Sequence, residues 1–208
     1  MTASPTWFNS QLSDAITPEG TQHGSTCGLH AFNHAMVSAS AIAHLPHAPV
    51  PKAAFESTAM AAHIGDAPRN LMDPGGSFYD VAVLNANFSA AGVTSFPMTP
   101  MDVQHKLGDV FGPHSIPEGE FRTAGYLLRT PSSGGHWITV IDARHVPYLH
   151  ATRPPAFLCD SLYSTAHAIT LQQTEDLLYV CAWEHAQRTS AQEFCPWHCF
   201  LVGVRIAE

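Results

Sequence analysis

The apolar residues of this chain follow a helical period in its first half and a strand period in its second half. Over residues 25–43 the spacing predicts a helix, one face of which holds four apolar side chains: Leu29, Phe32, Met36 and Val37. Residues 136–143 instead hold a dense run of β-branched side chains, which indicates a central strand. Helices that come before strands favour the α+β class, with the N-terminal helices packed on a mostly antiparallel sheet.

Weaker patterns predict the remaining elements. Helices are expected over about 52–64, 77–91, 100–111 and 170–184, and strands over 93–97, 123–130, 156–159 and 199–206. Ser25 and Ser77 stand where the N-caps of the first and third helices belong, and Gly92 stands where the third helix should end. Residues 132–135 are a turn signal directly before the central strand. The length of 208 residues fits one domain, so we expect 1–208 to fold as a single unit.

Charge and composition exclude several classes of protein. The net charge is −8 with only nine Lys and Arg, and no basic stripe is present, so nucleic acid is not an expected partner. No apolar run approaches the ~18 residues that a membrane span needs. Residues 1–14 lack the basic-then-apolar pattern of a secretory signal. The five cysteines form no disulfide framework, which favours reduced thiols and a cytoplasmic location, or the host cytosol if the chain comes from a pathogen.

The segment around Cys27 carries the strongest chemical signal. Cys27 lies at the predicted start of the first helix, where free backbone N–H groups and the positive end of the helix dipole favour a thiolate. A thiolate is the reactive form of a cysteine nucleophile. Gly28, which follows it, is expected to let a substrate approach the helix end. Taken alone, a cysteine at a helix start is more often structural than catalytic.

Three further residues complete a possible catalytic set. His136 begins the central strand after a flexible turn, where a base is well oriented to meet a cysteine on a facing helix. Asp160 ends an apolar stretch, and a carboxylate there can hold an imidazole in one tautomer. Gln22 lies five residues before Cys27, and its amide can donate a hydrogen bond to an oxyanion. Each alone is weak, but the order Gln, Cys, His, Asp is that of papain-like hydrolases.

The run from Gln22 to Asn33 adds a resemblance to a known family. It reads Gln-x-Gly-Ser-x-Cys-x-x-His-x-x-Asn and resembles the signature of the Josephin deubiquitinases. Residues 70–81, the His-Trp pair at 136–137 and the Asp-Ser pair at 160–161 are similar to later parts of the family pattern. The resemblance covers roughly residues 18–163 in the correct order.

This resemblance implies a papain-like Josephin fold and a thiol protease that cleaves ubiquitin from conjugates or chains without a cofactor or a metal. It assigns the nucleophile to Cys27, the base to His136 and the orienting acid to Asp160, and it makes Gln22 the oxyanion donor. His30 and Asn33 would support these groups from behind or serve the fold. Asn33 lies in the apolar stripe of its helix, which predicts a buried, hydrogen-bonded amide.

The chain departs from the family pattern in three segments. Residues 1–17 are expected to be an irregular arm, and residues 45–76 a variable helical arm and loop that do not resemble the family well. Residues 144–155 read as an insertion, since 23 residues separate His136 from Asp160. Linkage preference therefore does not transfer from the family.

The sequence is also compatible with three other functions. Cys195, His198 and Cys199 offer sulfur and imidazole ligands, although a tetrahedral zinc site needs four ligands and no second pair has suitable spacing. An inactive ubiquitin-binding module with a Josephin fold is a second possibility, against which the intact Gln, Cys, His and Asp set argues. A papain-like amidase or peptidase with a substrate other than ubiquitin is the third.

Overall fold

The computed structural model describes residues 26–65, 71, 79–116, 119–130, 136–146, 155–163, 165–189 and 199–206. Its helices are α1 (Cys27–Ile42), α2 (Lys52–Ala61), α3 (Val81–Ala90), α4 (Pro100–Lys106) and α5 (Leu171–Thr189), with a 3₁₀ turn at Ala143–His145. Its strands are β1 (Thr94–Pro97), β2 (Pro113–Ile116), β3 (Gly119–Thr130), β4 (His136–Asp142), β5 (Ala156–Cys159), β6 (His167–Ile169) and β7 (Cys199–Arg205).

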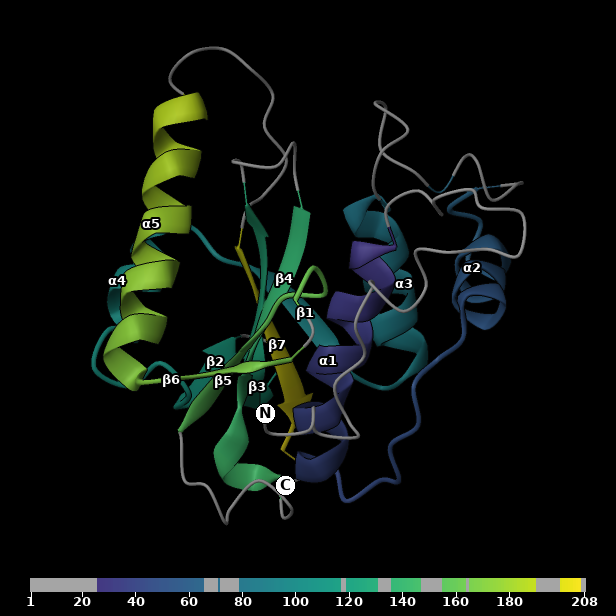
Figure 1. The fold of residues 1–208 in the computed structure, drawn as a ribbon, viewed down its shortest axis with the longest axis horizontal. Coiled ribbons are helices and arrows are strands. Elements are labelled where there is room, and N and C mark those ends of the chain that lie inside the picture. The colour runs from purple at the N-terminus through teal and green to yellow at the C-terminus, as the bar shows by residue number, and fades with distance from the viewer. Residues whose placement is uncertain are drawn as a thin grey trace.

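The strands form one sheet in the order β1-β7-β3-β4-β5-β6, and β2 pairs with the start of β3. Each of these pairings in the described part of the chain is antiparallel. Helices α1, α2 and α3 lie on one side of the sheet, and α4 and α5 lie on the other (Figure 1). The α+β class and the mostly antiparallel sheet that the sequence predicts are therefore confirmed.

Among the described residues, three clusters of buried apolar side chains fill the two sides of this sheet. Alternate residues of β7 point to opposite sides, so Phe200 and Val202 pack with α1 and α3 while Cys199 and Leu201 pack with α5. All seven residues of β4 are buried, as expected for a strand in the middle of a sheet that is covered on both faces. Among the described residues, no helix is both long and apolar enough to cross a bilayer.

Two buried hydrogen bonds fix α1 against β4. The hydroxyl of Thr139 donates to the carbonyl of Ala31 at 2.8 Å, and the hydroxyl of Ser38 donates to the carbonyl of Asp142 at 3.0 Å. The bond nearer the start of α1 is also the bond nearer the start of β4. The helix and the strand therefore run in the same direction. The N-terminal end of α1 therefore meets the N-terminal end of β4.

Several predicted boundaries are wrong, for local reasons. The N-cap of α3 is Asp80, whose carboxylate accepts from the N–H of Ala82 at 2.8 Å, whereas Ser77 lies outside the described residues. Gly92 has a φ of 69° directly after this helix, as predicted for its terminator. Helix α4 is shorter than expected and ends before Gly108, which has a φ of 92°.

The sequence-based assignment also missed two strands. β2 begins at Pro113, and β6 is only three residues long. Both strands are short and their local patterns are weak, and Pro113 lacks the N–H that a ladder needs, although proline is tolerated at a sheet edge. β3 begins at Gly119, four residues earlier than predicted, because its first part pairs with β2.

Candidate active site

The sulfur of Cys27 belongs to the first residue of α1. Thr26 occupies the N-cap position, its side chain makes no capping hydrogen bond, and the first turn holds no acidic residue. The predicted cap, Ser25, lies outside the described residues. The first N–H groups of a helix have no carbonyl partner within it. This end of α1 can therefore donate hydrogen bonds to an anion beside Cys27.

The imidazole of His136 is held by Asp160. Its Nε2 atom lies 2.7 Å from Oδ1 of Asp160, and the two side chains are 6% and 17% exposed. Asp160 follows β5, the neighbour of β4, so the sheet itself brings the two residues together. The backbone N–H of Leu162 donates to the same carboxylate oxygen at 2.9 Å, which fixes the carboxylate.

Cys27 is the second group that interacts with this imidazole. Burial alone would lower the pKa of His136, but hydrogen bonds with Asp160 and with Cys27, together with their charges, outweigh burial and raise this pKa to about 9. Because Nε2 is occupied by Asp160, Nδ1 is the ring nitrogen that remains for the thiol. The imidazole of His136 therefore interacts with Asp160 through Nε2 and with the thiol of Cys27.

The same contacts act on the carboxylate. Burial would raise the pKa of Asp160, but the hydrogen bonds from His136 and from the Leu162 N–H lower it overall. Asp160 is thus ionised at neutral pH while His136 is protonated. This arrangement suits an imidazolium that is formed beside a thiolate and oriented by a carboxylate.

Gly28 has a different role from the one predicted. A Cβ atom at this position would lie 3.2 Å from Cβ of Tyr79 and 3.5 Å from Cδ1 of Trp137. The open side of Gly28 is filled by these two side chains and is not free for a substrate. The glycine lets Tyr79 and Trp137 pack directly against the first turn of α1.

Asn33 and His30 lie behind the nucleophile on α1. The Asn33 amide donates to the carbonyl of Val50 at 3.1 Å and accepts from its N–H at 2.8 Å, which confirms a buried, hydrogen-bonded amide. It fastens the segment before α2 to α1. His30 is fully buried, and its ring centroid lies 6.5 Å from that of His34 on the next turn.

Other predicted residues lie outside the described part of the chain. These are Gln22, Cys195 and His198. Cys199 is buried at the start of β7, and burial raises the pKa of its thiol well above the usual value. Among the described residues, no group of three or more His, Cys, Asp or Glu side chains is placed to hold a metal ion.

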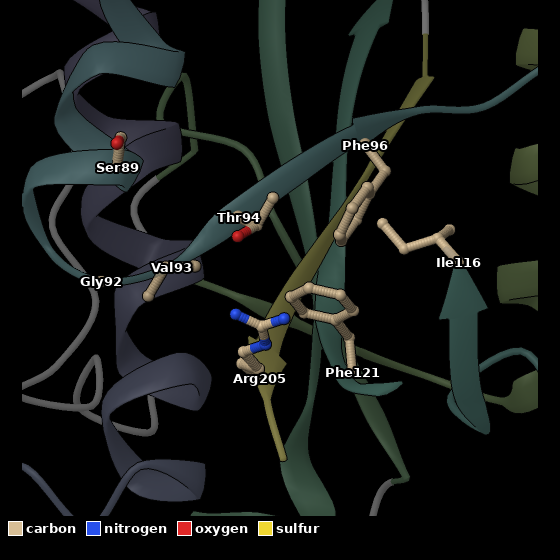
Figure 2. Close-up of a pocket in the computed structure, with 8 residues that line it drawn as sticks. All are labelled: Ser89, Gly92, Val93, Thr94, Phe96, Ile116, Phe121 and Arg205. Atoms are coloured by element: carbon tan, nitrogen blue, oxygen red, sulfur yellow. The ribbon is translucent and has the colours of Figure 1, made fainter. Parts of the chain in front are cut away.

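A separate groove lies at another edge of the sheet. It has a volume of about 700 Å³, and its walls include Phe96, Phe121 and Arg205 (Figure 2). The Arg205 guanidinium lies 5.9 Å from the centroid of the Phe121 ring. None of Cys27, His136 and Asp160 lines this groove, so it is distinct from the candidate active site.

The sequence reasoning missed the part that Tyr79 and Glu56 play beside this site. The phenol of Tyr79 donates to Oε1 of Glu56 at 2.7 Å. Tyr79 falls within a segment noted only for its resemblance to a family motif, and no local pattern predicts its partner on α2. Glu56 and Tyr79 are 23 residues apart in the chain, and only the folded structure brings them together.

No known protein-family model matches this chain, and no curated protein matches its sequence.

Proposed function

We propose that this protein is a thiol-dependent ubiquitin hydrolase of the Josephin type. The observation that carries the proposal is that His136 bonds to Asp160 and interacts with Cys27, since these are the residues that the family resemblance assigns to catalysis. Cys27 and His136 are buried and Asp160 is partly exposed, so the three residues lie at the edge of the core. A papain-like Josephin fold is part of the same proposal.

The reaction would begin when the Cys27 sulfur attacks the carbonyl carbon of the last glycine of ubiquitin. The resulting oxyanion would accept hydrogen bonds from the Cys27 N–H and from Gln22. His136 would then give its proton to the leaving amine, and the carbon–nitrogen bond would break to leave a thioester. Water, deprotonated by His136, would hydrolyse the thioester and restore the thiol.

Access to the sulfur is part of this mechanism. Only 1% of the Cys27 surface is exposed. A substrate carbonyl therefore reaches the sulfur only after the atoms that cover it move. We expect ubiquitin binding to drive this movement, so that small thiol reagents react slowly with Cys27 and a ubiquitin-based substrate reacts fast.

The test is the release of a fluorescent amine from the C-terminus of ubiquitin. Wild-type protein should release it, and Cys27→Ala should reduce the rate to background. Cys181→Ala is the matched control, because Cys181 is a buried thiol of α5 in the core on the other side of the sheet (Figure 1). Absence of release by folded wild-type protein would contradict the proposal.

Two further assays of the purified protein distinguish the proposed function from its alternatives. Ubiquitin binding without turnover, detected by NMR titration, would favour an inactive ubiquitin-binding module. Turnover of short peptide amides at Cys27 with no effect on ubiquitin would favour a papain-like amidase or peptidase.

A further inference from the structure

We propose that Tyr79 is a positioning residue that holds Cys27 against His136, and that Glu56 of α2 keeps Tyr79 in place. A catalytic role for Tyr79 rests on the proposed function. The position of Cys27 relative to His136 can be tested without it. Through Glu56 and Tyr79, the position of α2 would affect the position of the Cys27 thiol.

Tyr79 contacts both elements that carry the reactive pair. Its side chain packs on Gly28, the residue next to Cys27 in the first turn of α1. Its backbone carbonyl accepts a hydrogen bond from Nε1 of Trp137 at 3.1 Å, and Trp137 follows His136 in β4. Tyr79 therefore joins the start of α1 to the start of β4.

Tyr79 has little freedom to move within these contacts. It is 2% exposed, and its ring lies edge-on to Phe55 with centroids 5.2 Å apart. Burial, followed by the hydrogen bond to Glu56, raises the pKa of the phenol far above its usual value, and the charge of Cys27 adds to this shift. The phenol therefore stays protonated and donates to Glu56, and it lies within electrostatic reach of the thiol.

Glu56 connects this residue to α2. Its carboxylate is 14% exposed and accepts the 2.7 Å hydrogen bond from the phenol. Lys52 lies one turn earlier at 3.9 Å, but it is 45% exposed, so its ion pair adds little. A hydrogen bond between a buried phenol and a carboxylate is stronger than one between neutral groups. A displacement of α2 would therefore pull on Tyr79 and on the first turn of α1.

The experiment follows the titration of the His136 ring by NMR, assigned with a His136→Gln variant. Contact with Cys27 contributes to the high pKa of His136, so the midpoint of about 9 reports whether the thiol stays in place. Cys27→Ala should lower the midpoint of the His136 titration. Its midpoint is the reference value for complete loss of the contact between Cys27 and His136. Tyr79→Phe and Glu56→Ala should each move the midpoint at least halfway towards the Cys27→Ala value.

Two variants serve as controls. Glu56→Gln should keep the wild-type midpoint, because an amide oxygen still accepts from the phenol. Tyr179→Phe removes the hydroxyl of a tyrosine that is 56% exposed on α5, on the other side of the sheet, and should change nothing. If circular dichroism shows that Tyr79→Phe is unfolded, the test rests on Glu56→Ala alone.

A wild-type midpoint in folded Glu56→Ala, or in folded Tyr79→Phe, would overturn the proposal. With an active substrate, both variants should lower kcat at least threefold and leave KM within twofold. The titration needs no substrate. A shifted midpoint in a protein that does not cleave ubiquitin would therefore refute the proposed function and leave the positioning role intact.

Discussion

At the scale of single residues, one oxygen atom of Asp160 accepts two hydrogen bonds. Oδ1 faces Nε2 of His136 at 2.7 Å and the N–H of Leu162 at 2.9 Å. The second bond fixes the carboxylate, and the carboxylate in turn fixes the ring. Orientation and charge stabilisation are separate contributions, and substitution can separate them.

Asp160→Asn should therefore reduce activity only in part. The amide oxygen can accept both hydrogen bonds, so the orientation of the ring survives while the ionic contribution is lost. We expect kcat/KM to fall about 10-fold, the loss that corresponds to about 1.4 kcal/mol. Asp160→Ala, which also removes the orientation, should cost at least a further 10-fold. Complete loss of activity in a folded Asp160→Asn protein would contradict this role.

The protonation of His136 predicts the pH dependence of activity. In the proposed reaction His136 must be protonated to give a proton to the leaving amine, and its pKa is raised to about 9. The alkaline limb of kcat/KM should therefore have its midpoint near pH 9. Asp160→Asn should move this limb to lower pH, because the carboxylate helps to raise the pKa. A limb that stays in place in this variant would show that another group controls it.

The same shift links pH to stability. The folded-state pKa of His136 lies above the ordinary value of 6.5, so its stabilising contribution is complete below pH 6.5 and is lost as the pH rises through about 9. Asp160 acts in the opposite sense, since its lowered pKa contributes stability that is lost in acid.

Gly28→Ala tests the packing at the helix end. The added methyl group would lie 3.2 Å from Cβ of Tyr79, which is closer than most such contacts, so the neighbours must shift. We expect urea unfolding to show a loss of about 1–3 kcal/mol, the usual cost of overpacking a core. Activity should fall further than stability alone explains. A variant as stable and as active as the wild type would show that this contact is not constrained.

At the scale of elements, the site depends on the alignment of α1 with β4. Thr139 and Ser38 provide two hydrogen bonds along the length of the contact. Cys27 lies four residues before Ala31, about 6 Å along a helix, and His136 lies three residues before Thr139, about 10 Å along a strand. The bond at Thr139 is therefore the nearer of the two to the reactive pair.

Thr139→Val should weaken this alignment without changing the side-chain shape. The buried hydroxyl hydrogen bond is lost, and unfolding in urea should show a loss of about 1–2 kcal/mol. Thr58→Val is the matched control, because the Thr58 hydroxyl bond is exposed and lies within α2. Equal stability losses in the two variants would argue against a special role for the bond between α1 and β4.

Local sequence patterns predicted the elements that carry the reactive pair. The apolar stripe of α1 and the β-branched run of β4 are strong signals, because each element buries a large regular face. The bond between His136 and Asp160 was expected from residue order. The contacts of Tyr79 were not predicted, because they join residues 28, 56 and 137, and no local pattern encodes their meeting.

At the scale of the whole molecule, helices cover the sheet on both faces and the reactive pair lies where α1 and β4 begin. The groove near Arg205 is lined by other residues than the reactive pair. The net charge of −8 is compatible with a basic protein partner. The net charge does not define a substrate, which depends on the surface around the candidate site.

The central claim is that Cys27 is a nucleophile activated by His136 and directed at the C-terminus of ubiquitin. The most direct measurement is reaction with ubiquitin that carries a C-terminal electrophile, followed by mass spectrometry of the digested adduct. We predict one adduct, on the peptide that contains Cys27, which is lost in Cys27→Ala and slowed at least 10-fold in His136→Ala. An adduct on Cys195 or Cys199, or no adduct with folded wild-type protein, would contradict this account.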